Sequence, residues 1–223
     1  MIIVIDGPAG SGKSSSAKEI ANRLDIQYLD SGALYRAITY LWIAADKPDR
    51  KSFIELLPDV KLETVYKNQT FKVELNGADI SDEIRKQRVA ENVSKVAAIP
   101  EVRKFVNDYM INLVSCDVYI ADGRDLGSAV FTDAALKFYM DASIDERAKR
   151  RYKEMKESDK DSSVTFEEVR DNLKDRDYKD QNRSADPMKK ADDAIVIDTT
   201  GKTFNEQISE MIDIIKNQIK LKY

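Results

Sequence analysis

Short runs of apolar residues alternate along this chain with stretches in which apolar residues recur every three or four positions. The runs are rich in β-branched and aromatic residues, which is typical of strands buried on both faces. They begin near residues 2, 27, 118, 136 and 194. The periodic stretches between them predict amphipathic helices. Because strands and helices alternate, we expect an α/β fold with a five-stranded parallel sheet flanked by helices.

One segment departs from this alternation. Residues 60–65 and 70–75 alternate apolar and polar side chains with a period of two, which predicts half-exposed antiparallel strands. A helix from Ser81 to Ala97 is expected to follow them. We therefore predict a small antiparallel insert over residues 47–97, within a core domain formed by residues 1–46 and 98–223.

The first apolar run leads directly into Gly7-Pro-Ala-Gly-Ser-Gly12-Lys13-Ser14, which fits the P-loop pattern G-x-x-x-x-G-K-[ST]. Glycines let backbone N–H groups approach a phosphate, and the N-terminus of the following helix attracts anions, whereas a chance glycine-rich turn would lack this context. Lys13 is predicted to reach the β- and γ-phosphates, and Ser14 to hold Mg²⁺. The residues predicted to bind the phosphate donor are Gly7, Pro8, Ala9, Gly10, Ser11, Gly12, Lys13, Ser14 and Ser15.

Two other predicted strands also end in polar residues and glycine. Asp30-Ser31-Gly32 follows the second strand, and Asp122-Gly123-Arg124-Asp125 follows the third. Ligands of open α/β sheets bind beyond the carboxyl ends of the strands, so both segments are expected near the P-loop. Asp122 is placed like a Walker-B acid and is a second predicted Mg²⁺ ligand, directly or through water. An ordinary polar turn is the alternative for residues 122–125.

A stripe of residues in the C-terminal half begins apolar and becomes charged. Val169, Leu173, Arg176, Asp180 and Arg183 follow one another at spacings of four, three, four and three. If the helix persists, they share one face, which suits a helix that closes over an anionic site. The alternative is a ladder of surface salt bridges.

Composition removes several classes of function. The 223 residues include no histidine, which excludes a Ser-His-Asp triad and His-ligated metals, and a single cysteine, Cys116, expected to be a small buried side chain at a helix end. The net charge of −4 argues against general nucleic-acid binding. No run of 18 apolar residues occurs, so no membrane span is expected and a cytoplasmic setting fits. The residues alone thus indicate a P-loop phosphotransferase or NTPase.

Several motifs, in this order, resemble those of the bacterial cytidylate kinase family, and the likeness runs essentially end to end. They are Ile5-Asp-Gly-Pro-Ala-Gly-Ser-Gly-Lys13, Leu29-Asp-Ser-Gly-Ala-Leu-Tyr-Arg36, Val93-Ser-Lys-Val-Ala-Ala98 with Pro100 and Val102-Arg103, Ile120-Ala-Asp-Gly-Arg-Asp-Leu-Gly127, and Arg176-Asp177 with Asp180 and Arg183. The P-loop is common to many functions, whereas the second and fourth motifs are far more specific. The resemblance implies transfer of the ATP γ-phosphoryl group to CMP or dCMP, with Mg²⁺ as cofactor. It also makes the insert a nucleotide-monophosphate-binding segment and residues 150–184 approximately a helical lid.

The resemblance also implies roles for individual residues. By this likeness, Ser31, Arg36 and Arg124 hold the CMP phosphate, while Ser94, Arg103 and Asp125 read the cytosine. Arg176 and Asp180 address the ribose and the phosphates, and Arg183 stabilises the transition state. Lys13, Arg124, Arg176 and Arg183 are thus the expected catalytic residues, and Arg147, Arg150 and Arg151 are expected to help as the lid closes. The chain is expected to act as a monomer on small molecules.

Two departures and two alternatives accompany this resemblance. Tyr178, Lys179 and Gln181 stand where the family often carries arginines, and Thr132 where it often has proline. One alternative is another P-loop kinase with a different nucleoside monophosphate as acceptor. The other is a nucleotide-dependent switch, although the Asn-Lys-x-Asp motif of GTPase switches is absent from the sequence.

Overall fold

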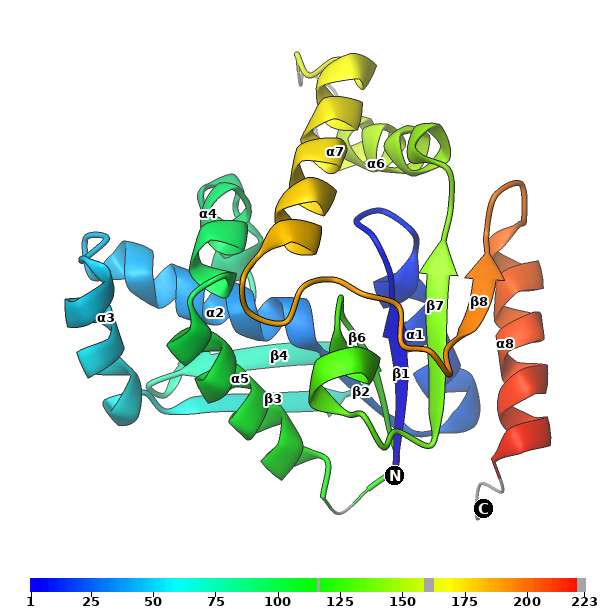
Figure 1. Ribbon diagram of the computed structural model, residues 1–223, viewed down its shortest axis with the longest axis horizontal. Coiled ribbons are helices and arrows are strands. Elements are labelled where there is room, and N and C mark those ends of the chain that lie inside the picture. Colours follow the sequence, from blue (N-terminus) through cyan, green and yellow to red (C-terminus); the bar gives the residue numbers. More distant parts are fainter. Residues whose placement is uncertain (116, 159–162, 220–223) are drawn as a thin grey trace.

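The computed structural model describes residues 1–115, 117–158 and 163–219. Its centre is a parallel sheet in the order β2-β6-β1-β7-β8 (Figure 1). These strands are β1 (Ile2–Asp6), β2 (Gln27–Asp30), β6 (Tyr119–Asp122), β7 (Leu136–Asp141) and β8 (Ile195–Asp198). Every residue of β1 is buried, as its apolar run predicts. The predicted five-stranded parallel sheet is confirmed.

Helices cover both faces of this sheet. They are α1 (Lys13–Leu24), α2 (Ser31–Ala44), α5 (Pro100–Leu113) and α8 (Phe204–Gln218). Helix α8 begins with a complete capping box, in which Thr203 and Glu206 satisfy each other's backbone N–H groups. Its apolar residues pack against α1, and α8 lies beside the edge strand β8 (Figure 1).

The insert contains a second, antiparallel sheet in the order β3-β4-β5. Its elements are α3 (Arg50–Leu56), the 3₁₀ turn η1 (Leu57–Asp59), β3 (Leu62–Lys67), β4 (Thr70–Leu75), β5 (Ala78–Asp79), the 3₁₀ turn η2 (Glu83–Arg85) and α4 (Gln87–Ala97). The prediction of one helix from Ser81 to Ala97 is wrong. The chain makes the turn η2 and is extended at Lys86, so that α4 starts only at Gln87.

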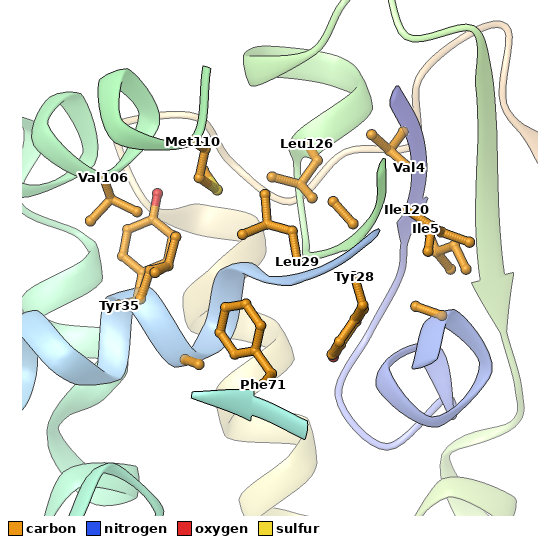
Figure 2. Packing of buried hydrophobic residues seen from close by; sticks show 14 of the residues in the cluster. Val4, Ile5, Tyr28, Leu29, Tyr35, Phe71, Val106, Met110, Ile120 and Leu126 are labelled. Atoms are coloured by element: carbon orange, nitrogen blue, oxygen red, sulfur yellow. The ribbon is translucent and has the colours of Figure 1, made fainter. Parts of the chain in front are cut away.

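One hydrophobic cluster joins the two sheets. Figure 2 shows Tyr28 of β2 beside Phe71 of β4, whose ring centroids are 5.7 Å apart. The same cluster includes Val106 and Met110 of α5. The insert therefore shares its core with the parallel sheet within the described residues. Its division from the core domain as a separate unit stays a prediction.

Two helices lie above the carboxyl ends of the strands: α6 (Ile144–Ser158) and α7 (Phe166–Asn182) (Figure 1). They have a small cluster of their own, in which Val169 and Leu173 of α7 pack with Ala148 of α6 and with Ala9. Helix α7 starts with the capping box Thr165–Glu168. The short π-helical turn η3 (Leu126–Val130) follows β6.

Two expectations concern residues outside the described part. Cys116 lies there, and so do residues 159–162 of the stretch 157–163, which is polar, lacks periodicity and is predicted from the sequence to form a mobile tip. Among the helices of the described residues, none is both long enough and apolar enough to cross a membrane.

Candidate functional site

A cavity of about 780 Å³ opens at the carboxyl ends of β1, β2 and β6. Many of the predicted site residues line it, although they come from five separate segments of the chain. These are Ala9, Gly10, Gly12, Lys13, Ser14, Ser15, Ser31, Arg36, Ser94, Asp122, Arg124, Asp125, Arg176, Asp180 and Arg183. The remaining predicted residues, Gly7, Pro8, Ser11 and Arg103, lie outside this lining. The fold thus brings nearly all predicted site residues to one cavity.

The P-loop takes the conformation that its glycines allow. Gly7 has a φ of 145° and lies against the carbonyl oxygen of Met140, with which a Cβ atom would collide. Gly12 has a φ of 91° and is the residue before the first turn of α1. These left-handed conformations favour glycine, since a side chain would be strained there. The loop therefore ends with the free N–H groups of α1 facing the cavity.

Lys13 is buried and folds back onto its own loop. Its ammonium donates to the carbonyl of Pro8 at 2.7 Å and to Ser11 Oγ at 3.4 Å. Burial, followed by the positive charge of Arg124, lowers the pKa of Lys13 well below its usual value. Both acceptors are uncharged, so a bound polyanion would supply the negative partner for this ammonium.

Asp122 is the centre of a hydrogen-bond network next to the P-loop. Its two carboxylate oxygens accept from Ser14 Oγ at 2.6 Å and from the Tyr28 hydroxyl at 2.7 Å. Burial and the nearby carboxylate of Asp30 raise the pKa of Asp122 to about 6. Asp30 itself caps α2, because its side chain accepts from Ala33 N at 2.8 Å. The predicted pair of Ser14 and Asp122 is therefore in direct contact.

These two residues fit a magnesium ion chemically. Both offer hard oxygen ligands, and a cation would favour the charged form of a carboxylate that burial disfavours. Magnesium keeps several waters and needs few protein ligands, so two residues suffice when phosphates supply the rest. No group of three or more Asp, Glu, Cys or His residues able to hold a metal occurs within the described residues.

Opposite the P-loop, three arginines face the cavity with little negative charge to balance them. Arg124 pairs with Asp180 at 3.2 Å and donates to the carbonyl of Gly7 at 2.8 Å. Arg176 is half-buried, and desolvation together with the charge of Arg124 lowers its pKa to about 10. Its Nε has no hydrogen-bond partner within the described residues. Among the residues that the structure describes, Arg36 reaches only a backbone carbonyl, that of Ile84 at 3.4 Å, so the cluster is suited to an anionic ligand.

Asp125 forms a second, more closely paired cluster. It accepts from Arg103 Nη2 and, at 2.5 Å, from Arg183 Nη2. Arg183 was expected on the α7 face with Arg176 and Asp180, but α7 ends at Asn182 and Arg183 has extended backbone angles. Its side chain nevertheless reaches the same cavity. Ser94 of α4 lines the cavity near these residues, and Ser31 Oγ donates to the carbonyl of Asp122 at 2.6 Å.

Two carboxylates near the P-loop make contacts that the sequence did not predict. The carboxylate of Asp177 accepts from Ala9 N at 3.0 Å and from Arg147 at 2.5 Å, and Arg147 also donates to Ala9 O at 2.9 Å. The carboxylate of Asp6 accepts from the backbone N–H groups of Leu126 and Gly127. Asp177 directly follows Arg176 but does not belong to the predicted helical stripe. The contact of Asp6 could have been suspected, because Asp6 is an acidic residue at the end of an otherwise apolar strand.

Arg147 therefore links the helices α6 and α7 to the P-loop. Its guanidinium is buried and joins α6, α7 and the P-loop. Its expected help in closure, together with Arg150 and Arg151, stays a prediction. Arg150 is held by Thr199, and Arg151 by Glu154. Both of these arginines also line the cavity.

Comparison with known proteins agrees with this geometry. A family model described as "Cytidylate kinase" matches residues 3–217. The chain is 40% identical over 224 residues to the cytidylate kinase of Salinibacter ruber, covering 98% of each chain. It is 41% identical over 222 residues to that of Clostridium tetani, covering 99% of this chain and 94% of the relative.

A solved structure shows the fold independently of sequence. An uncharacterized protein from Eubacterium ventriosum is similar with a TM-score of 0.54 at 13% identity, over 97% of this chain and 98% of that one. At this identity the likeness supports the α/β fold alone. The family model and the full-length relatives, by contrast, identify the chain as a kinase that belongs to the cytidylate kinase family.

Proposed function

We propose that this protein transfers the γ-phosphoryl group of ATP to CMP or dCMP, which gives CDP or dCDP. The observation that carries the proposal is the pairing of two anion sites on one cavity. The P-loop forms one of them, and the arginines Arg36, Arg124 and Arg176 form the other. A hydrolase needs only the first site, whereas a kinase that acts on a nucleoside monophosphate must also bind the phosphate of its acceptor.

The donor phosphates would lie on the P-loop. Backbone N–H groups at the start of α1 would bind them, and Lys13 would leave Pro8 O to align the group in transfer. Ser14 and Asp122 would hold Mg²⁺ with the phosphates. When bound, this ion neutralises phosphate charge and orients the donor for in-line transfer.

The acceptor phosphate would be held from the opposite side. Arg36 and Arg124, with the Ser31 hydroxyl, form the proposed phosphate site. Arg176 and Asp180 would contact the ribose and the phosphates. Because the Nε of Arg176 is buried and makes no hydrogen bond within the described residues, directing it to a ligand costs little. Lys13, Arg124, Arg176 and Arg183 would together stabilise the charge that develops on the transferring group.

The cytosine would be read by the Asp125 cluster with Ser94. Cytosine offers acceptors at O2 and N3 and a donor at N4, so an arginine and a carboxylate can each find a partner. Arg103 and Asp125 supply these groups in one buried pair. A uracil would present a donor at N3 and an acceptor at O4, which would leave the pair mismatched.

Motion of the insert and the upper helices would exclude water from the transfer. Residues 47–97 would close on the acceptor and residues 150–184 approximately on the donor. The proposal has the enzyme act as a monomer on free nucleotides in the cytoplasm.

One acceptor screen tests the proposal. With ATP and Mg²⁺, initial rates are measured for CMP, dCMP, UMP, AMP and GMP. CMP and dCMP are expected to react at least about tenfold faster than UMP, because one mismatched hydrogen-bonded pair costs about 1.5 kcal/mol or more. Equal rates with CMP and UMP would contradict the cytosine assignment, and phosphorylation of a purine alone would replace it.

A further inference from the structure

Asp186 lies in the connection between α7 and β8 and holds both arginines that pair with Asp125. Its carboxylate accepts from Arg103 Nε at 2.7 Å. Its backbone carbonyl accepts from Arg183 Nε, also at 2.7 Å. One residue therefore contacts both guanidiniums through two different oxygen atoms, next to the Nη2 atoms that Asp125 accepts from.

Arg103 is fixed from three directions. Its side chain is only 2% exposed. Its guanidinium lies 5.3 Å from the centre of the Tyr35 ring, within the range of a cation–π contact. Asp186 takes Nε and Asp125 takes Nη2. The third nitrogen, Nη1, is buried without a hydrogen-bond partner in the part of the chain that the structure describes.

This arrangement leaves one donor of a fixed guanidinium for a ligand. A guanidinium is planar, so a partner on Nε sets the plane in which both Nη atoms donate. Without Asp186, the plane of Arg103 would be set by Asp125 and by the Tyr35 ring alone. Asp125 is shared with Arg183, so it cannot set that plane as firmly.

The backbone of Asp186 is adapted to this double contact. Its φ is 44°, in the left-handed region that non-glycine residues adopt rarely and that aspartate tolerates better than most. The side chain is 37% exposed, yet its carboxylate points to a buried arginine. Such a conformation turns the carbonyl and the carboxylate to the two arginines at once.

We propose that Asp186 is a positioning residue for the acceptor base. It orients Arg103 so that Nη2 binds Asp125 while Nη1 donates to the base of the bound nucleoside monophosphate. The inference rests on the proposed function, because it assumes that Arg103 and Asp125 read the acceptor. It adds a residue from the loop after α7 that neither the sequence motifs nor the cavity lining contains.

The test measures binding of CMP alone and of ATP alone by titration calorimetry. Asp186→Gly removes the carboxylate, keeps the carbonyl that holds Arg183, and accepts a positive φ without strain. Its dissociation constant for CMP is expected to rise about tenfold, while that for ATP changes less than about twofold. Asp186→Asn keeps an oxygen for Nε and is expected to retain most of the CMP affinity.

Asp193→Gly is the matched control. Asp193 lies in the same connection and pairs with Lys137, away from the cavity, so neither affinity should change. Thermal melting checks each variant, and Asp186→Ser replaces Asp186→Gly if the glycine variant does not fold. An unchanged CMP affinity, or equal losses for CMP and ATP, would overturn the inference. Failure of the proposed function would appear differently, as a wild-type protein that neither binds nor phosphorylates CMP.

Discussion

The P-loop side of the cavity comes from one stretch, residues 9–15, whereas the opposite side is assembled from distant elements. On the first side, here called the donor wall, backbone N–H groups and one lysine face the cavity. On the second, the acceptor wall, residues from α2, the loop after β6 and the end of α7 meet. The positions of the backbone N–H groups are determined by the local conformation of the P-loop. The positions of the side chains on the acceptor wall depend on the residues that they pair with.

The two walls also differ in how their charges are balanced. Lys13 of the donor wall is buried, and its hydrogen-bond acceptors in the described part of the chain are a carbonyl and a hydroxyl. On the acceptor wall, Asp125 already pairs with Arg103 and Arg183. A phosphate would therefore balance the positive charge of Lys13 on the donor wall. An acceptor base, by contrast, must form hydrogen bonds with groups that already belong to ion pairs. We expect substitutions on the two walls to separate ATP binding from CMP binding.

The largest effect is expected on the donor wall, from Lys13→Met. Methionine fills a similar volume without the charge, so kcat should fall about a thousandfold, in the range seen when one charge-stabilising group is lost. Binding of CMP alone should stay within about twofold, because Lys13 makes no contact with the acceptor wall's ion pairs. Steady-state kinetics and calorimetry measure the two quantities.

Lys18→Met is the control for this change, since Lys18 is exposed on the same helix. It should leave both quantities unaltered. If Lys13→Met weakened CMP binding as much as it lowered kcat, the two walls would not be independent.

This contrast also explains what the sequence could predict. The donor wall is a contiguous pattern between a strand and a helix, and six of its nine predicted residues line the cavity. On the acceptor wall, Arg103 and Asp125 are 22 residues apart and meet only in the folded chain. Their spacing carried no information about this contact, and only the resemblance to a family brought them together.

The errors have a physical origin as well. The helical stripe from Val169 to Asp180 is correct, since Val169, Leu173 and Asp180 are buried. Arg183 lies beyond the last residue of the helix. The prediction placed it on the helical face because the exact end of a helix is poorly determined by periodicity. Asp177 was overlooked, because its role depends on Ala9, which lies 168 residues away in the chain.

Asp6 joins the two walls, and its titration offers the next test. It ends β1 before the P-loop, and its carboxylate accepts from Leu126 N at 2.9 Å and Gly127 N at 2.7 Å, just after Asp125. Burial raises its pKa to about 6, against the lowering effect of these hydrogen bonds. The folded protein therefore binds a proton on Asp6 more tightly than the unfolded chain does, so this group favours folding below the unfolded pKa and loses that effect as pH rises through about 6.

Asp6→Asn cannot titrate, so its comparison with the wild type isolates this effect. Urea unfolding is measured for both proteins from pH 4 to pH 7. The free energy of unfolding of the wild type, relative to Asp6→Asn, should fall by up to about 3 kcal/mol across this interval, since one pKa unit corresponds to about 1.4 kcal/mol. Parallel curves would show that Asp6 has the same pKa in the folded and unfolded chains.

A smaller, more selective effect is expected on the acceptor wall, from Asp125→Asn. The substitution keeps the shape of the side chain and removes the charge that Arg103 and Arg183 share. The KM for CMP should rise about thirtyfold, about 2 kcal/mol, as for a lost hydrogen bond to a charged group, while the KM for ATP stays within about twofold. Asp133→Asn, an exposed aspartate in the same connection between β6 and β7, should change neither KM. Equal increases in both KM values would mean that the Asp125 cluster supports the whole cavity and does not select the acceptor.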